Sequence, residues 1–184
     1  YQELTGLPKG SYTISVQAYN RQGLNEDIAA GWNQSDPQKD VLSYLFGNDA
    51  KEKVRHLYEF HYASNEDLAN NGSQISGTGT AIDGQWVPNG VAGGEAAFAF
   101  NDRTDYTTTI TCYVGEDGKL RFGITMPTGP NSNNWTLFDN FHIQYLGAAD
   151  MTGAVSALNA KIAETNTALA DKAITTEEAY NALS

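Results

Sequence analysis

The chain has 184 residues, 40% of them apolar, and carries a formal net charge of −11 at pH 7. That length is enough for one domain of ordinary size plus an appendage. An acidic chain without a basic stripe repels phosphate backbones, so nucleic acid is not an expected partner. No apolar run approaches the roughly 20 residues that cross a bilayer, so direct membrane insertion is not expected.

The composition predicts an all-β body. Ten tyrosines, seven phenylalanines and three tryptophans favour strands, and 18 glycines favour turns. Cys112 is the single cysteine, which leaves no disulfide within the chain, so burial must hold the fold together. Because Cys112 is in phase with Ile110 and Val114, it is expected to fill the core rather than to react.

The first half of the chain contains the clearest strand pattern. Over residues 12–19, apolar side chains alternate with hydroxyl and amide side chains, which predicts a half-buried strand. Residues 40–47 and 53–61 are predicted to be two further strands, separated by a polar turn at Asn48 and Asp49. The segment 63–84 is rich in Ser, Asn, Gly and Asp, so a surface loop is expected there.

The second half yields a helix and a predicted hairpin. Residues 90–100 are predicted to form a short helical turn that buries Phe98. Residues 106–114 and 119–125 both alternate, and the turn at 115–118 has a glycine at each end. Glycine supplies the positive φ that tight turns require, so the two strands are predicted to form a β-hairpin.

The stretch 135–147 is central to the predicted fold. At period two, Phe141, Ile143 and Tyr145 fall on one face of a strand, and Asp139 interrupts the aromatic residues. A carboxylate there loses hydration unless a cation, an arginine or backbone donors compensate. Two structural roles are open for Asp139: a buried pair with Arg21, or a ligand of a structural calcium together with backbone carbonyls.

The last 36 residues change to a helical pattern. Met151, Val155, Leu158, Ile162 and Leu169 recur at helical spacing, which predicts an amphipathic helix over residues 150–172. A capping box at residues 175–178 predicts a second helix. Residues 1–148 are therefore predicted to be a β-domain, and residues 149–184 a helical hairpin that begins, or links to, a following module of the same polypeptide.

Three segments resemble a known family of secreted or surface modules from gut Bacteroidetes. Residues 7–23 match its opening pattern L-P-x-G-x-Y-x-[LI]-x-x-Q-A-[FY]-x-R-x-G. Residues 87–98 resemble a mid-domain segment, V-P-N followed by A-A-x-x-F. Residues 116–124 and 135–147 resemble the closing segment, which includes W-T-x-F-D-N-F-x-[LI]-x-Y-x-G and is the most specific part.

The resemblance implies a jelly-roll β-sandwich of the galactose-binding-like class, an architecture shared by many carbohydrate-binding modules. The implied ligand is a glycan, by association, because fold does not fix function. The implied location is secreted or at the cell surface. The modules of this family carry strands upstream of the first motif, so the sandwich is expected to lack these.

A sugar site needs an aromatic platform beside planar polar groups in a concave surface. Trp32 and Trp86 lie in polar loops, and their polar neighbours Asn33, Gln85 and Asn89 complete the candidate ligand-binding set. The alternative for both tryptophans is a ring packed under its own loop. Trp135 belongs to the strand motif and is expected in the core.

No motif indicates catalysis. His56, His61 and His142 lack a Cys partner or a His-Glu-x-x-His grouping, so a zinc site is not expected. The sequence has no Gly-x-Ser-x-Gly elbow and no P-loop, and no carboxylate pair stands in a recognisable setting. The expected function is non-catalytic glycan binding, with no cofactor beyond the possible calcium. The alternative is a structural spacer or adhesion module without a small ligand of its own.

Overall fold

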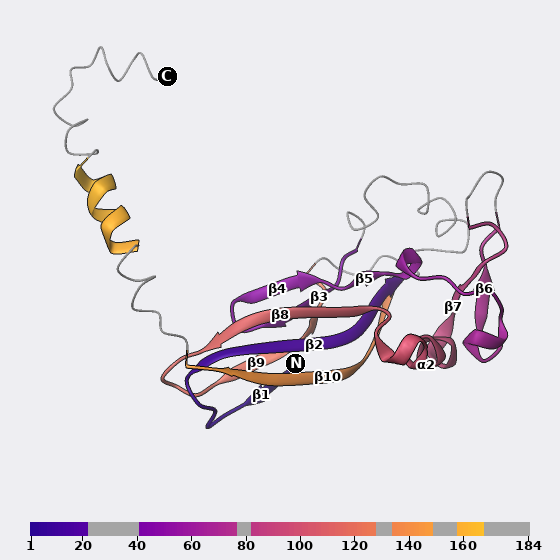
Figure 1. Ribbon diagram of the computed structural model, residues 1–184, viewed down its shortest axis with the longest axis horizontal. Coiled ribbons are helices and arrows are strands. Elements are labelled where there is room, and N and C mark those ends of the chain that lie inside the picture. Colours follow the sequence, from indigo (N-terminus) through magenta and orange to yellow (C-terminus); the bar gives the residue numbers. More distant parts are fainter. Residues whose placement is uncertain (22–40, 77–81, 128–133, 149–157, 168–184) are drawn as a thin grey trace, which may run out of the picture. The chain divides into compact units, whose positions relative to one another are not determined.

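The computed structural model describes residues 1–21, 41–76, 82–127, 134–148 and 158–167 (Figure 1). The chain divides into two units, Tyr1–Ala148 and Ala149–Ser184. The first unit is rich in antiparallel strands, as the composition predicted, and no sheet in its described part closes as a barrel.

Two four-stranded sheets form the body of the first unit (Figure 1). Sheet A has the order β1 (Gln2–Leu4), β9 (Leu120–Thr125), β3 (Tyr44–Gly47) and β4 (Ala50–Lys53). Sheet B places β2 (Gly10–Arg21) between β10 (Trp135–Gly147) on one side and β8 (Thr107–Val114) on the other. The short strand β5 (Arg55–His56) pairs in parallel with the end of β2, beyond β8.

Smaller elements cluster at one end of this body. The strands β6 (Gly72–Gln74) and β7 (Trp86–Pro88) form a two-stranded sheet. The helix α2 (Gly90–Ala99) follows β7, and three short 3-10 turns complete the set: η2 (Leu57–Glu59), η3 (Glu66–Leu68) and η4 (Asn101–Arg103). The predicted helical turn at 90–100 is confirmed, and Phe98 is buried as expected.

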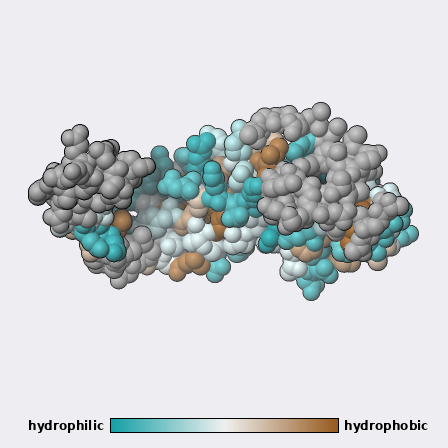
Figure 2. Space-filling model, turned by 90° about the horizontal axis from the view of Figure 1, so that it is seen from above, coloured by the Kyte–Doolittle hydropathy of each residue, from teal (hydrophilic) through white to brown (hydrophobic). Residues whose placement is uncertain are grey.

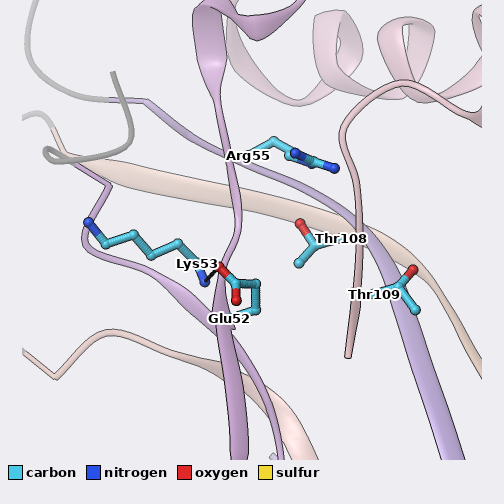
Figure 3. Close-up of a pocket in the computed structure, with 5 residues that line it drawn as sticks. All are labelled: Glu52, Lys53, Arg55, Thr108 and Thr109. Carbon is cyan, nitrogen blue, oxygen red and sulfur yellow. Dashed lines mark hydrogen bonds between the residues drawn. The ribbon is translucent and has the colours of Figure 1, made fainter. Parts of the chain in front are cut away.

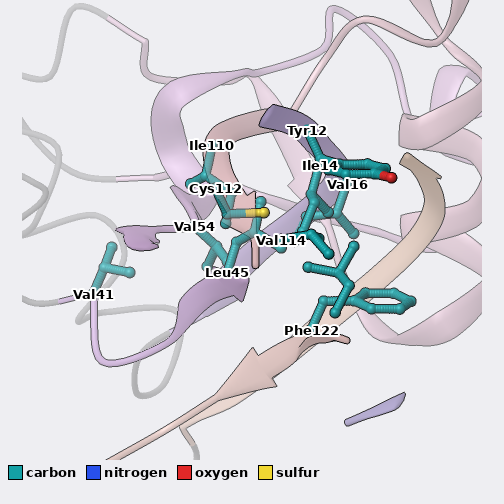
Figure 4. Packing of buried hydrophobic residues seen from close by; sticks show 12 residues of the cluster. Tyr12, Ile14, Val16, Val41, Leu45, Val54, Ile110, Cys112, Val114 and Phe122 are labelled. Atoms are coloured by element: carbon teal, nitrogen blue, oxygen red, sulfur yellow. The ribbon is translucent and has the colours of Figure 1, made fainter. Parts of the chain in front are cut away.

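The first core lies between sheets A and B (Figure 4). The alternating residues of β2 contribute Tyr12, Ile14, Val16 and Ala18, as predicted from their period of two. The two sheets therefore face each other in a sandwich-like arrangement. Cys112 lies in this core, and burial raises the pKa of its thiol.

The second core lies under α2 and the short elements and is mostly aromatic. Tyr19, Phe98 and Tyr106 meet edge to face or tilted, with ring centroids 4.9–6.2 Å apart. The hydroxyl of Tyr106 donates to the carbonyl of Leu57 at 2.7 Å and approaches that of Phe60 at 3.0 Å. A buried tyrosine needs such a partner, so these contacts fix where the short turn η2 lies.

One extra residue in β10 lets this strand serve both cores. The pairing with β2 shifts between Asp139 and His142, and Asn140 in the bulge has a φ of 56°. Before the bulge Leu137 packs on the second core, and after it Ile143 packs on the first. A slip of one residue turns side chains to the opposite face of a sheet, and asparagine tolerates the left-handed backbone. The face predicted for residues 141–145 therefore applies only to the part of β10 that follows the bulge.

Three sequence predictions need correction. The runs 106–114 and 119–125 are strands, but β8 pairs with β2 and β9 pairs with β1 and β3, so the hairpin prediction is wrong. The turn at 115–118 instead passes the chain from sheet B to sheet A. Residues 53–61 contain the last residue of β4, then β5 and η2, rather than one strand. The segment 63–84 is more than a surface loop, since Leu68 and Ile75 reach the second core.

On the edge of β8 that does not pair with β2, side chains cover both ends of the strand. The Nε of Arg55 donates to the carbonyl of Thr107 at 2.8 Å, and the Nδ2 of Asn48 donates to the carbonyl of Tyr113 at 2.7 Å. These two carbonyls lie on the side of β8 that faces away from β2. Unpaired strand edges recruit other strands, so both contacts shorten the stretch that is open to pairing.

In the second unit, residues 158–167 are helical, as predicted. Leu158 and Ile162 of its apolar stripe are exposed. Residues 150–157, where the predicted helix begins, and the second helix predicted after residue 175 lie outside the described residues. No helix in the described segments is long and apolar enough to cross a membrane.

Candidate functional site

The predicted loop site is only partly within the described chain. Trp32 and Asn33 lie outside the described residues. Trp86 sits in β7, half-buried, and packs against the second core. Asn89 is exposed, but its Oδ1 already accepts a hydrogen bond from Nη1 of Arg21 at 2.9 Å. Gln85 is half-buried beside Trp86. Three of the five predicted residues thus share one segment, but Trp86 is not an exposed platform.

Asp139 does not occupy the setting predicted for it. Its side chain is exposed, and its Oδ1 accepts the backbone N–H of Asn140 at 2.8 Å. In the ladder, Asp139 lies opposite Gln17, whereas Arg21 lies opposite Trp135. Four residues of strand, about 13 Å, separate the two positions. The prediction of a buried pair between Asp139 and Arg21 is therefore wrong, because this register keeps the two residues apart along the ladder.

The calcium hypothesis for Asp139 stays a prediction. Within the described ranges, no three His, Cys, Asp or Glu side chains group closely enough to hold a metal ion. A calcium at Asp139 would depend on backbone and amide oxygens for its remaining ligands.

Trp135 is half-buried against the second core. Its ring lies 5.8 Å from that of Tyr19, edge to face, and the guanidinium of Arg21 lies 5.8 Å from its centroid. The structural role predicted for Arg21 and Trp135 therefore takes a different form, in which the two residues pair with each other across the ladder.

The outer face of sheet B is polar. The register places Thr109 beside Ser15 and Ser15 beside His142, so one row of polar side chains crosses β8, β2 and β10. The next row toward the start of β2 is Thr111, Thr13 and Gln144. This face follows from the alternation, since the intervening residues of β2 point into the first core. Figure 2 shows a different side of the molecule, seen from above, on which mainly hydrophilic and neutral residues cover the middle of the visible described surface.

An open pocket of about 380 Å³ lies on this face where β10 bulges. We call it the face pocket. Its lining residues come from three strands and from the turn after α2: Ser15, Val16, Gln17, Arg103, Thr107, Asn140, Phe141 and His142. The volume lies in the range of small-molecule and sugar sites, although it is at the small end.

The lining of the face pocket divides into structural and available groups. Gln17 is buried and fully engaged, because its Nε2 donates to the carbonyls of Phe98 and Asp105 and its Oε1 accepts from Asn140 at 2.6 Å. By contrast, Ser15, Thr107, Arg103 and His142 make no side-chain hydrogen bond to any described residue. These four can bind a ligand without breaking a contact within the described part of the protein.

A left-handed turn positions Arg103. Asn101, Asp102 and Arg103 have φ values of 45°, 53° and 64°. Each such residue costs roughly 1–2 kcal/mol relative to the right-handed form, so the surroundings must impose the turn. The buried carboxylate of Asp105 does so, since it accepts from Nδ2 of Asn101 at 3.1 Å and from the hydroxyl of Tyr62 at 3.2 Å.

A second pocket of about 250 Å³ opens on the other side of β8, between the edges of the two sheets (Figure 3). We call it the edge pocket. Glu52 and Lys53 come from β4 and Arg55 from β5, while Thr108 and Thr109 come from β8. The Oγ1 of Thr108 is buried and has no hydrogen-bond partner among the described residues. The Nε of Arg55 donates to the carbonyl of Thr107, and its Nη1 lies 3.1 Å from Oε1 of Glu59.

Sequence reasoning missed most of these residues. The alternation over residues 141–145 leaves His142 on the polar face, but no signal joined it to Ser15 or to the segment that holds Arg103 and Thr107, both far from it in the chain. The clue available in the sequence was the run Asn101–Asp102, two residues that tolerate left-handed backbone and can begin a tight turn.

Neither pocket contains the groups of a recognisable catalytic centre. The face pocket has no carboxylate in its lining, and the edge pocket has only Glu52. Both pockets offer hydroxyls and cationic or imidazole nitrogens, which suit the recognition of an oxygen-rich ligand. Comparison with protein-family models, with curated proteins and with solved structures found no match.

Proposed function

We propose that this protein is a non-catalytic module of an exported or cell-surface protein, and that it binds a glycan in the face pocket. We further propose that its sandwich is a jelly roll of the galactose-binding-like class. The observation that carries the proposal is the face pocket itself: hydrogen-bonding side chains from three strands and from the turn after α2 line it, and four of them are not engaged with described residues.

The chemistry of the pocket supports a sugar. Ser15 and Thr107 can donate to and accept from sugar hydroxyls, while Arg103 is a planar donor. Phe141 is also among the lining residues, but its side chain packs against the first core, with its ring centroid 5.5 Å from that of Phe122, so the hydrogen-bonding groups carry the recognition. The site lies on strands rather than on loops, apart from Arg103, so it is held rigidly before the ligand arrives.

Affinity electrophoresis and calorimetry against a panel of soluble polysaccharides test the proposal. His142→Ala removes a pocket residue that is exposed, so it should weaken binding without affecting folding. Gln144→Ala is the matched control, since Gln144 lies two residues further along β10 on the same face and outside the pocket. Equal binding by both variants would place the glycan elsewhere.

The loop site is tested in the same experiment with Trp32→Ala and Trp86→Ala. Loss of binding in these variants, with His142→Ala unaffected, would return the site to the loops. The spacer function is the second candidate, and the half-buried packing of Trp86 and Trp135 favours it. It predicts that no polysaccharide binds to the unaltered protein.

A further inference from the structure

We propose that the glycan is an extended acidic polysaccharide that crosses sheet B from the face pocket to the edge pocket, with its anionic groups at Arg103 and Arg55. This inference rests on the proposed function and names the class of ligand and the direction of its chain.

The two pockets adjoin along β8. Thr107 lines the face pocket, and the next two residues, Thr108 and Thr109, line the edge pocket. The hydrogen bond from Nε of Arg55 to the carbonyl of Thr107, 2.8 Å long, joins the two sites through β8. A ligand that leaves the face pocket across this strand therefore enters the edge pocket directly.

The row between the pockets is longer than one sugar ring. From His142 through Ser15 to Thr109, it spans two strand spacings, about 10 Å, and the edge pocket continues it beyond β8. All three side chains are polar. A chain that crosses the strands can therefore make hydrogen bonds along its whole length.

Each of the two pockets has an arginine in its lining. Arg103 lines the face pocket, whose lining contains no carboxylate. At the edge pocket, Arg55 uses Nε and Nη1 for Thr107 and Glu59, and a guanidinium has five N–H donors, so others can reach an anionic group. Glu52 accepts from the backbone N–H of Lys53 at 3.3 Å (Figure 3). The net charge of −11 disfavours anionic ligands at long range, so the two arginines must act locally, through charge-assisted hydrogen bonds inside the pockets.

The hydroxyl of Thr108 adds an independent observation. Thr108 is 3% exposed, lines the edge pocket, and its Oγ1 lacks a partner within the described residues. Buried polar groups without a partner are rare, and a ligand oxygen in the edge pocket would provide one.

Two matched pairs of polymers test the charge. Polygalacturonate is compared with its full methyl ester, and dextran sulfate with dextran, by calorimetry at fixed ionic strength. We expect at least one acidic polymer to bind on the order of tenfold more tightly than its neutral partner, as expected for a charge-assisted hydrogen bond. The pair that shows the difference identifies a carboxylate or a sulfate as the recognised group.

Variants test the path. Arg103→Asn keeps a residue that tolerates positive φ and should weaken the acidic polymer on the order of tenfold. Arg121→Asn removes an exposed charge outside both pockets and should not. Thr109→Glu places a negative charge in the middle of the path and should abolish binding, whereas Thr111→Glu, two residues along the same face, should have little effect. Asp139→Asn should strengthen binding of the acidic polymer, because Asp139 is on the same face opposite Gln17.

The outcomes separate this inference from the proposed function. Equal binding of neutral and acidic polymers, or equal effects of Thr109→Glu and Thr111→Glu, would overturn the acidic extended chain and leave glycan binding in place. If no polymer binds to the unaltered protein, the proposed function fails and this inference fails with it.

Discussion

The two cores of the first unit are built on different principles. The first core is filled mainly by aliphatic residues from alternating strands. The second core is mostly aromatic, and the hydroxyls of Tyr62 and Tyr106 hold short turns in place by hydrogen bonds. Regular strands therefore specify the sandwich, whereas hydrogen bonds from buried side chains specify the short turns beside the face pocket.

Deletion of Asn140 should break both cores and have the largest effect. Without the extra residue, either Leu137 or Ile143 turns to the wrong face of sheet B. We expect a larger loss of unfolding free energy than from any single truncation, measured by urea denaturation. Asn140→Gly is the control, because glycine accepts the φ of 56° and loses only the hydrogen bond to Gln17, at about 1 kcal/mol. A deletion variant as stable as the glycine variant would contradict the two-face account of β10.

Leu45→Ala tests the first core alone. Leu45 is fully buried between the sheets, so its truncation should lower the free energy of unfolding by about 2–5 kcal/mol through lost burial and a residual cavity. Leu146→Ala is the matched control, since Leu146 is 52% exposed and should change stability by roughly 0.5 kcal/mol or less. Similar losses in the two variants would show that Leu45 is not in a tightly packed core.

The pH dependence of stability tests the surroundings of His56, which precedes η2 at the second core. Burial lowers the pKa of His56 to about 3, well below its ordinary value, and its Nδ1 accepts the N–H of Tyr58 at 3.4 Å. Between pH 6.5 and 3 the unfolded chain binds the proton and the folded chain does not, so stability is lost as the pH falls through this window. The loss attributable to His56 should be on the order of 2–4 kcal/mol.

The measurement is the unfolding free energy at several pH values in the unaltered protein and in His56→Asn, whose side chain does not titrate. The difference between the two should shrink toward acidic pH. His142→Asn is the control for the substitution itself, because His142 is exposed. A parallel profile for His56→Asn would show that folding does not lower the pKa of His56.

The strand pattern of the sandwich could be predicted, but its pairing could not. The alternation of Tyr12, Ile14 and Val16 gives a buried face directly, and β2 and the first core follow from it. The same alternation in 106–114 and 119–125 cannot say which neighbour each strand takes, so a hairpin was predicted where the chain changes sheets. Local pattern encodes which side is buried, whereas pairing depends on the whole chain.

The candidate site was harder to predict for the same reason. The pairing of β2 with both β8 and β10 brings together Ser15, Thr107 and His142. Arg103 joins them because Asp105 holds the left-handed turn. Trp86 drew attention as an aromatic residue in a polar segment, but the second core uses part of its ring. Asp139 appeared buried because its neighbours are aromatic, yet the bulge leaves it exposed.

The closed edge of β8 has a consequence for modules that occur in tandem or at high density. Arg55 and Asn48 occupy the outward carbonyls of Thr107 and Tyr113, which leaves only the short interval around Thr109 and Thr111 to accept a foreign strand. Copies crowded side by side on one polypeptide or one membrane surface should therefore resist fusing their sheets along this side, and each should keep its polar face open to solvent.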